Sequence, residues 1–421
     1  MTHWEPRPPT PSSLGDHAVP IESDHLLGKR IALLVTGGIA ALKTPLLARA
    51  LRRHGASVTA FASEEALRYV TEETLAWSTN RAVVTRLTPE SEHLSDNDRF
   101  DAYLVAPATY NTINKVACGI ADGVITATLA SALGRLEAGD CAVLVCPTMH
   151  GSMHTQILSA SLERLQRLGV QVVPPRDDYG KHNLPDEEPI VAAVSAAVSC
   201  SPLRGKRILV TGGPVPARLD SVRRLSSPFT GALSIAVASD LSMCGADVTL
   251  ILGAPSHAAP QWLNAIIAHD VEEYRALVLG AVASRPTDSA VLTAAVADFA
   301  PEAQATGKRS SGGGPWNVTL LPTAKVIDEL HAAHPALDIV GFKYEVGITR
   351  EALFTIAVER ASRYGACVAT LADENARGAE QVAWMVARGH EPHRVEGKPA
   401  IAVAIRHHLE QGTLTHRRAH L

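Results

Sequence analysis

The chain has 421 residues, and its 39 Lys and Arg against 43 Asp and Glu give a formal net charge of −4. This near balance argues against a protein that wraps nucleic acid through a global basic field. Hydrophobic residues make up 46% and charged residues 19%, which excludes global disorder, whereas aromatic residues make up only 4%. A core of Ala, Val, Leu and Ile suits a parallel sheet covered by helices, and the length favours two or three domains of about 150 residues each.

The N-terminal segment is not expected to be a secretory signal. Residues 1–27 are rich in Pro, Ser and His and lack the apolar centre of a signal peptide, so we expect a mobile extension. No stretch reaches the ~18 uncharged apolar residues that a membrane-spanning helix needs. The six cysteines form no Cys-x-x-Cys pair, which indicates neither a zinc site nor a disulfide framework. Reduced thiols favour a cytoplasmic location, and we expect no membrane or nucleic-acid partner.

Two segments of the chain open alike, each with a basic pair, a short apolar run and two glycines. They are residues 28–38 (GKRIALLVTGG) and 205–213 (GKRILVTGG). A helical stretch follows each of them, residues 41–53 in the first half, and a second strand is expected at 55–59 and at 245–249. This β-α-β order favours parallel sheets with right-handed crossovers. We therefore predict two doubly wound, Rossmann-like, three-layer α/β domains in tandem.

The boundary between the two domains is expected near residue 202, in the linker 199–204. This places the first domain over residues 28–198 and the second over residues 203–421. A loop at residues 306–315 holds a Ser-Ser-Gly-Gly-Gly run and is expected to be a flexible flap or a plain linker. Because ligands of open α/β sheets lie beyond the carboxyl ends of the strands, functional side chains are expected there.

The first two strand ends of the first half suit a phosphate. Gly37 and Gly38 let an anion approach the backbone, and free amides from Ile39 onward start a helix, although a plain tight turn is the alternative. The pattern is not Gly-x-Gly-x-x-Gly, so the standard dinucleotide fingerprint is absent. Ser63, after the second strand, is placed to cap the next helix and to contact a phosphate in addition.

The third and fourth strand ends carry denser polar motifs. The third reads Pro-Ala-Thr-Tyr-Asn-Thr at residues 107–112, and the fourth reads Pro-Thr-Met-His-Gly-Ser-Met at residues 147–153. Capping a helix uses only one of the hydroxyl or amide side chains in the third motif, so several in a row favour a ligand. The candidate cofactor-binding residues of these two motifs are Pro107, Ala108, Thr109, Asn111, Thr112 and Met149.

These motifs resemble those of the homo-oligomeric flavin-containing cysteine decarboxylases, over about residues 28–195. Residues 107–112 look like the family's Pro-Ala-Ser-Ala-Asn-Thr, and residues 147–153 look like its Pro-x-Met-Asn-x-x-Met. His93 stands where the family has its catalytic His. The resemblance implies FMN at the residues named above, oxidation of a Cys side chain with loss of carbon dioxide, and His93 as the base or proton carrier. It also implies trimers with FMN at the subunit contacts.

Two departures from this family fall at substrate-facing positions. His150 stands in place of the Asn that grips the substrate carboxylate, and its imidazole can still donate a hydrogen bond. The family's flap carries an acidic Cys, whereas residues 177–188 contain none, so reduction of the enethiol lacks its usual proton donor. The resemblance therefore supports flavin binding more strongly than the standard decarboxylation.

Strand ends in the second half suit a nucleotide. The first strand ends at Gly212 and Gly213, and the basic and hydroxyl side chains up to residue 231 suit an anion cradle, with an irregular loop as the alternative. A later strand exit ends in Asp298, and Lys308 follows ten residues on. A carboxylate there suits a ribose or a metal contact.

This half resembles phosphopantothenate–cysteine ligase, which many bacteria fuse after the decarboxylase in one coenzyme A enzyme, and the match now covers about residues 28–408. Residues 219–223 look like the family's Leu-Asp-Pro-Val-Arg, and residues 294–299 look like its Ala-Ala-Val-Ala-Asp-Tyr. The resemblance implies that CTP activates a carboxylate as an acyl-cytidylate, that Mg²⁺ and Lys neutralise charge, and that the cysteine amine displaces CMP. It also implies ligase dimers. The implied nucleotide-binding residues are Gly212, Gly213, Ala295, Asp298, Lys308, Phe342 and Arg360.

The second half also departs from its family. Ser227 stands in place of the Asn that handles the acyl intermediate, and Ala232 in place of a Lys. The family's Asn-Pro-Asp becomes residues 323–325, and its downstream Lys pair aligns with Arg360 and Tyr364. Three hypotheses follow: a divergent bifunctional coenzyme A enzyme, a relative that uses flavin or CTP on another carboxylate or thiol, and a non-catalytic flavin-binding regulatory protein.

Overall fold

The computed structural model describes residues 6–94, 99–254, 256–303, 307–312, 314–375 and 380–419. The chain divides between Ser199 and Cys200 into two compact units, which are treated separately below. None of the helices in these ranges is both long enough and apolar enough to span a bilayer.

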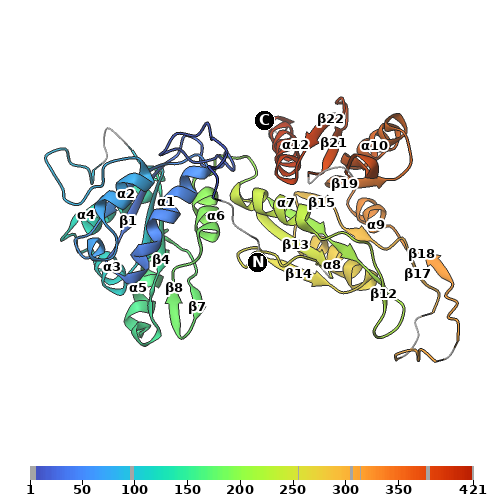
Figure 1. Cartoon of the computed structure of the whole chain (residues 1–421), viewed down its shortest axis with the longest axis horizontal. Helices are drawn as coiled ribbons and strands as arrows, with labels where there is room; N and C mark the ends of the chain where they lie inside the picture. Colours follow the sequence, from blue (N-terminus) through green and yellow to red (C-terminus); the bar gives the residue numbers. More distant parts are fainter. Residues whose placement is uncertain are drawn as a thin grey trace. The chain divides into compact units, whose positions relative to one another are not determined.

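The first unit is built on a parallel five-stranded sheet (Figure 1). Its strands are β1 (Arg30–Val35), β2 (Ser57–Ala62), β3 (Ala102–Ala108), β4 (Ala142–Pro147) and β6 (Gln171–Val172). The strand order is β2-β1-β3-β4-β6, so the direction of winding reverses between β1 and β3. All seven residues of β3 are buried, as expected of a strand covered on both faces.

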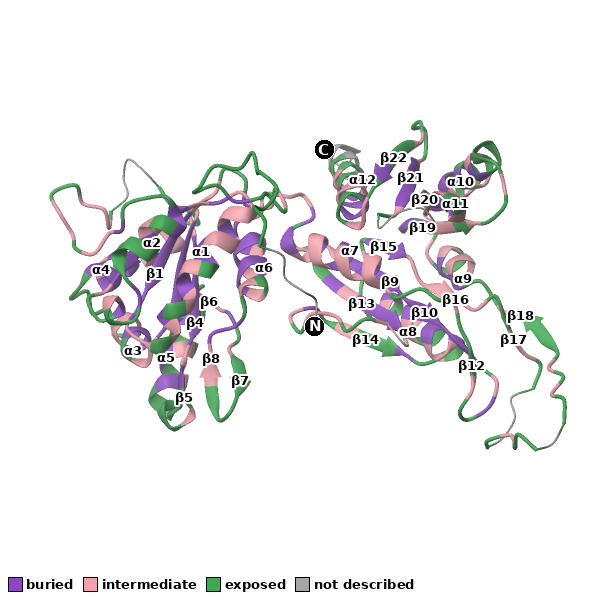
Figure 2. Ribbon diagram, viewed as in Figure 1, coloured by how far each residue is buried: buried purple, intermediate pink, exposed green. Residues whose placement is uncertain are grey.

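Helices cover both faces of this sheet. They are α1 (Thr44–Arg53), α2 (Glu72–Thr79), α3 (Tyr110–Ala117), α4 (Val124–Glu137), α5 (Gln156–Arg167) and α6 (Glu187–Val198), with short 3₁₀ turns η1 (Ile39–Lys43), η2 (Ala66–Arg68) and η3 (Gly151–Met153). Apolar residues of α1, α2 and α6 pack on one face, and those of α3, α4 and α5 pack on the other. The strands between them are buried while the outer helix faces are exposed (Figure 2).

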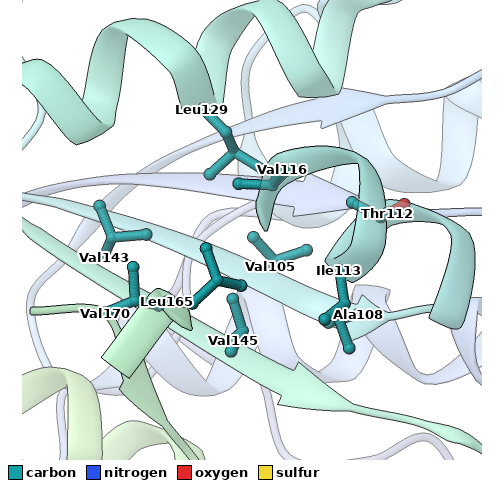
Figure 3. Close-up of a pocket in the computed structure, with 10 residues that line it drawn as sticks. All are labelled: Val105, Ala108, Thr112, Ile113, Val116, Leu129, Val143, Val145, Leu165 and Val170. Carbon is teal, nitrogen blue, oxygen red and sulfur yellow. The ribbon is translucent and has the colours of Figure 1, made fainter. Parts of the chain in front are cut away.

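Apolar packing beneath α3 holds that helix against the sheet. Figure 3 shows Ile113 and Val116 of α3 lying over Val105 of β3, together with other apolar side chains of β4, α4 and α5. The cavity among them measures about 10 Å³, which holds at most one water molecule. This spot is therefore packed core, and it anchors the helix whose first turn carries the Thr-Tyr-Asn-Thr motif.

The N-terminal extension expected to be mobile over residues 1–27 is in part attached to the first unit. Leu26 is fully buried, and its amide donates to the carbonyl of His54 at 2.8 Å. The Glu22 amide donates to the Arg53 carbonyl at 2.8 Å. Residues 1–5 lie outside the described residues. The sequence pattern missed this attachment because a few apolar and backbone contacts carry it, without regular secondary structure.

The second unit contains an eight-stranded sheet. Its strands are β9 (Arg207–Gly212), β13 (Asp247–Gly253), β14 (Ala265–Ala268), β15 (Ser289–Leu292), β19 (Asp338–Glu345), β20 (Gly365–Leu371), β21 (Val382–Ala387) and β22 (His393–Glu396). The order is β14-β13-β9-β15-β19-β20-β21-β22, and the first six strands are parallel in the order typical of dinucleotide-binding folds. The last two are antiparallel, which the prediction of a parallel sheet did not include.

Helices again cover both faces of this sheet. They are α7 (Ala232–Met243), α8 (Val271–Ser284), α9 (Val326–Ala333), α10 (Arg350–Tyr364), α11 (Ala372–Asn375) and α12 (Lys398–Ala419). Residues of α7 and α12 pack on one face, and those of α8, α9 and α10 pack on the other. Both units are thus doubly wound three-layer domains, and the predicted fold class is confirmed.

Short strands decorate the two units outside the main sheets. In the first unit β5 (Met149–His150), β7 (Arg176–Asp178) and β8 (Lys181–Asn183) form a small antiparallel sheet. In the second unit the short strands are β10 (Pro214–Val215), β11 (Ala217–Arg218), β12 (Arg224–Leu225), β16 (Ala295–Val296), β17 (Phe299–Pro301) and β18 (Leu320–Pro322). The pair β17 and β18 forms the base of an arm that includes Lys308.

Candidate functional site

Hydroxyl side chains join the carboxyl ends of β1 and β3. The Thr36 hydroxyl donates to the Pro107 carbonyl at 2.7 Å, and the Thr109 amide donates to the Thr36 hydroxyl oxygen at 3.3 Å. The Thr109 and Thr112 hydroxyls lie 3.2 Å apart at the start of α3. This is the point where the strand order reverses, which is where open α/β sheets bind their ligands. We call Gly37, Gly38, Ile39, Ser63 and residues 107–112 the cradle.

The glycines of the cradle let three chain segments meet. A Cβ atom on Gly37 would overlap Glu65 Cβ, and one on Gly38 would lie 3.3 Å from Thr109 Cγ2. The Ser63 hydroxyl accepts a hydrogen bond from the Ala66 amide at 3.2 Å, which is the capping role predicted for it. Glycine is therefore required at position 37 so that the end of β1 can pack closely against the segment that carries Ser63 and Glu65.

The exit of β4 adjoins the cradle. Ala108 and Pro147 are register partners, and the Thr148 amide donates to the Ala108 carbonyl at 3.0 Å. The predicted motifs at residues 107–112 and 147–153 are thus side by side. Met149 is buried, whereas the His150 side chain is exposed to solvent.

One tautomer of His150 is favoured by its neighbour Ser152. The Ser152 amide donates to His150 Nδ1 at 3.2 Å, and the Ser152 hydroxyl lies 2.8 Å from the same nitrogen. Because an amide can only donate, Nδ1 carries no proton, and the neutral ring then carries its proton on Nε2. His150 therefore presents an N–H donor at the exit of β4, as expected of a group that grips a carboxylate.

His93 lies in the loop before β3, and its Nδ1 atom is buried without a hydrogen-bond partner among the described residues. The adjacent Glu92 accepts hydrogen bonds from the hydroxyl and the amide of Thr88, and these bonds lower the pKa of its carboxyl. Among the described residues, no hydrogen bond or ion pair joins His93 to the cradle. Its predicted catalytic role therefore stays a prediction, although an unpaired buried nitrogen is unusual for a purely structural His.

The second unit holds a large cavity of about 1170 Å³ beyond the ends of β9, β15 and β19. Among the residues that line it are Gly213, Ser227, Ala295, Asp298, Phe342 and Arg360, all predicted from the sequence. Three lining side chains, those of Ser227, Arg360 and Thr370, have buried polar atoms without a hydrogen-bond partner. Buried polar atoms are normally paired, so these three atoms in the wall of the cavity are candidates for hydrogen bonds with a polar ligand.

Charged groups gather at two places along the wall of this cavity. Lys325 forms an ion pair with Asp298, so the predicted ribose or metal contact already has a cation beside it. The Tyr364 hydroxyl donates to Asp328, and Arg363 Nη2 lies 2.9 Å from the same carboxylate oxygen. Burial and the Asp328 hydrogen bond raise the pKa of Tyr364 to about 12, which keeps the phenol protonated.

Two predicted nucleotide contacts fall outside the lining of the cavity. Gly212 lies beneath it, and a Cβ atom there would overlap the Ser234 side chain, so its role is packing. Lys308 is exposed on the arm and does not line the cavity with Asp298. Contacts of the next residue, Arg309, hold this part of the arm away from Asp298. The Arg309 amide donates to Asp220 at 3.3 Å, and the Arg309 guanidinium lies 5.1 Å from the Trp316 ring centre.

Asp220 holds the base of this arm. Burial alone would raise the pKa of its carboxyl, but hydrogen bonds from the amides of Arg223, Val222 and Arg309 and from the Arg223 guanidinium lower it to about 2. The Leu-Asp-x-Val-Arg motif thus works as a structural joint between the arm and the loop that follows β9. Residues 306 and 313 of the expected flap lie outside the described residues.

Sequence reasoning missed several residues of both sites. Thr36 lies in the quoted Thr-Gly-Gly run, and its hydroxyl next to the glycines was the available signal. Lys325 was noted only within residues 323–325, which replace the family's Asn-Pro-Asp, and no pattern along the chain indicated that Asp328 and Arg363 line the cavity. The aromatic pair Phe229 and Tyr344, with ring centres 5.2 Å apart, was also not predicted.

Comparisons with known proteins agree with this geometry. The family model described as Flavoprotein matches residues 20–199, and the one described as DNA/pantothenate metabolism flavoprotein C-terminal domain matches residues 203–404. The Coenzyme A biosynthesis bifunctional protein CoaBC of Thermococcus kodakarensis is 34% identical over 366 residues, covering 86% of this chain and 89% of that protein. This chain belongs to the CoaBC family.

A second CoaBC relative, from Methanocaldococcus jannaschii, is 28% identical over 345 residues and covers 82% of this chain and 83% of its own. The solved structure of the DNA/pantothenate metabolism flavoprotein from Streptococcus pneumoniae is 20% identical and covers 52% of this chain and 100% of its own, with a TM-score of 0.43. Membership of the CoaBC family confirms the predicted fusion, an enzyme of coenzyme A biosynthesis in which a decarboxylase-type flavoprotein domain precedes a ligase-type domain.

Proposed function

We propose that this CoaBC-family enzyme joins 4′-phosphopantothenate to cysteine with CTP in its second domain and decarboxylates the product with FMN in its first domain, yielding 4′-phosphopantetheine. The observation that carries this proposal is the cavity of the second unit, where five of the seven predicted nucleotide residues and Ser227 meet around unpaired buried polar atoms. A ligand with many polar groups would satisfy those atoms, as CTP and an acyl-cytidylate do.

The cradle fits the phosphate and ring of FMN. Gly37 and Gly38 bring the end of β1 close to Glu65 and Thr109, Thr109 and Thr112 supply hydroxyls, and the first turn of α3 has amides without a side-chain cap. Bound FMN supplies a two-electron oxidation of a thiol-bearing carbon. The protein's own part is to hold the substrate carboxylate through His150 Nε2–H and to accept a proton at the unpaired Nδ1 of His93.

In the second domain the chain orients a nucleotide and its acid substrate by charge. Asp298 accepts ribose hydroxyls while Lys325 and Arg360 face the phosphates, and Ser227 donates to the acyl group in place of an amide. No group of three His, Cys, Asp or Glu side chains in the described ranges could hold a metal ion. Mg²⁺ ordinarily binds through one or two carboxylates together with substrate phosphates and water, and we propose that it enters with the phosphates of CTP.

Exposed apolar surfaces support a homo-oligomer. Ile39, Leu42 and Leu46 recur at helical spacing with exposed fractions of 69%, 54% and 61%, which suits a contact between copies of the first domain. The arm of the second unit also exposes Phe299 and Leu321 and holds Lys308 outside its own cavity. We propose trimer contacts through the first domain and dimer contacts through the second, with Lys308 serving a partner's cavity. All six cysteines are free, which suits a reducing compartment such as the cytoplasm.

One assay tests the proposed function. Purified protein receives CTP, Mg²⁺, 4′-phosphopantothenate and cysteine, and CMP release is measured with each substrate left out in turn. We expect CMP only when both the acid and cysteine are present, followed by carbon dioxide release from FMN-loaded protein. CMP released only with another acid would indicate a different pathway, and a yellow protein that never consumes CTP would overturn the ligase half.

A further inference from the structure

A β-hairpin of the first unit lies against the exit of β4. The strands β7 and β8 form the hairpin, and β8 pairs with β5 so that His182 faces Met149 and Lys181 faces His150. The Gly151 amide also donates to the Gly180 carbonyl at 3.0 Å, which fixes the hairpin turn. The hairpin is therefore held on the very strand that carries two predicted site residues.

Three titratable side chains form a continuous hydrogen-bonded chain across this sheet. Asp177 Oδ1 lies 2.5 Å from His182 Nδ1, and His182 Nε2 lies 2.7 Å from His154 Nδ1. At the far end, His154 Nε2 lies 3.2 Å from the Ser159 hydroxyl of α5. The groups come from β7, β8, the turn after η3 and α5, so the fold brings them together rather than local sequence.

The carboxylate at one end sets the protons along the whole chain. Ionised Asp177 only accepts, so His182 Nδ1 carries a proton and neutral His182 leaves Nε2 as an acceptor. His154 must then donate from Nδ1, which leaves His154 Nε2 to accept from Ser159. Both imidazoles are thereby held in the Nδ1–H tautomer, and every donor in the chain points toward Asp177.

Both ends of the hydrogen-bonded chain are open to solvent, and they differ in the residues that lie next to them. The Asp177 side chain is 72% exposed, and its only ion-pair partner in the described part of the protein is His182. At the other end His154 is also exposed, and the residue that follows it, Thr155, has its hydroxyl 3.4 Å from the Tyr110 hydroxyl of the cradle. His182 also lies on the same face of the small sheet as the buried Met149.

The other charged groups of the hairpin are engaged elsewhere or face away. Arg176 pairs with Asp186 at 3.1 Å, and Lys43 of η1 lies 3.4 Å from the same carboxylate. Lys181 and Asp178 are register partners of each other, on the face opposite to His182. The hairpin contains no thiol, so His182 is its only side chain that ordinarily gains or loses a proton near neutral pH.

We propose that Asp177, His182 and His154 form a proton relay for the flavin domain, an inference that rests on the thiol chemistry proposed above. A proton taken up at His154 Nε2 displaces the Ser159 hydroxyl. His154 then passes its Nδ1 proton to His182 Nε2, and His182 passes its own Nδ1 proton to Asp177, which releases it to solvent. One proton enters and one leaves, and the reverse order delivers a proton to the site.

The tautomers provide a test that needs no turnover. Nitrogen-15 NMR of the full-length protein with labelled histidine distinguishes Nδ1–H from Nε2–H rings, and we expect the Nδ1–H form for both His154 and His182. Asp177→Ala is expected to return His182 to the Nε2–H form, whereas Asp178→Ala, a carboxylate on the same strand without contact to His182, leaves both unchanged. Nε2–H rings in the unaltered protein, or tautomers indifferent to Asp177→Ala, would overturn the relay.

Turnover provides the second test. With 4′-phosphopantothenoylcysteine and FMN-loaded protein, His182→Gln is expected to lower kcat roughly 100-fold while KM and FMN content stay unchanged, because general acid–base groups contribute on that order. Asp178→Ala again serves as the matched control. Unchanged kcat in His182→Gln would refute the relay. Should the unaltered enzyme consume no thiol substrate, the proposed function of the first domain fails, and the relay is then decided by the tautomers alone.

Discussion

The cradle of the first domain and the cavity of the second begin from nearly the same sequence but treat their polar groups differently. In the cradle, the Thr36 hydroxyl is hydrogen-bonded to the Pro107 carbonyl and to the Thr109 amide, and the Thr109 and Thr112 hydroxyls lie close together. In the cavity, Ser227 and Arg360 have buried polar atoms without partners. The cradle is thus prepared by hydrogen bonds within the chain, whereas the cavity leaves bonds for its ligand to complete. The similar opening sequences of the two domains therefore predict the place of each candidate site but not how its polar groups are paired.

The largest expected effect comes from removing an unpaired polar group of the cavity. Arg360→Ala is expected to lower kcat/KM for CTP about 100-fold, or about 2.7 kcal/mol, because a charged hydrogen-bond donor is lost from the partly buried wall of the cavity. FMN content is expected to stay unchanged. Arg350→Ala on the same helix, where the guanidinium pairs with Glu374 at 2.6 Å, is the control. Equal losses in both variants would contradict a ligand role for Arg360.

A second prediction concerns the glycine that directly follows β9. Gly213 has φ of +72°, and a Cβ there would overlap the Ser256 side chain, so Gly213→Ala is expected to destabilise the second domain by about 2 kcal/mol or more. Gly205 has φ of +75° but open space around it, so Gly205→Ala measures the backbone strain alone at about 1 kcal/mol. Thermal unfolding of both variants gives the difference, and equal shifts would mean that close packing at Gly213 adds nothing.

A third prediction tests the hydrogen bonds of the cradle. Thr36→Val keeps the shape of the side chain but removes its bonds to Pro107 and Thr109, at a cost of about 1 kcal/mol. We expect the affinity for FMN to fall about tenfold, measured by flavin absorbance after dialysis, while CTP turnover stays unchanged. Thr59→Val on the neighbouring strand β2 is the matched control. Full FMN retention would show that the cradle does not need its internal bonds.

The smallest expected effect is a pH dependence of the free energy of unfolding of the second domain. The pKa of Asp220 is about 2 in the folded chain against 3.8 as its ordinary value, so the ionised form stabilises the fold above about pH 4. This contribution is lost as the pH falls from 4 toward 2, because the folded state must then take up a proton it disfavours. Urea unfolding of the second domain between pH 5 and 3 is expected to show a steeper loss in the unaltered chain than in Asp220→Asn.

The strand ends were predictable because local chemistry dictates them. An apolar run followed by Gly-Gly or by Pro and hydroxyls identifies a buried strand that stops, and β1, β3, β4 and β9 all follow that pattern. The cavity-lining Asp298 and Phe342 were predictable for the same reason, since each directly follows or ends such a run.

What the pattern missed depends on partners far away along the chain. Lys308 keeps a convenient spacing from Asp298, yet Asp220, 89 positions from Arg309, decides where the arm lies. The His154–His182 contact joins residues 28 positions apart through a hairpin without any sequence signature. The antiparallel strand β22, at one edge of the sheet, has a single buried residue, Val395, and so lacks the continuous apolar run that identifies the central strands.

Lys325 gives the carboxylate of Asp298 a counter-ion that belongs to the protein itself. Both side chains are more than half exposed, so water screens the pair and each group can exchange its partner for another. In the proposed reaction the Lys325 ammonium is therefore available to a phosphate, and the Asp298 carboxylate to a hydroxyl of the nucleotide. Until a ligand arrives, the ion pair holds both groups in the wall of the cavity.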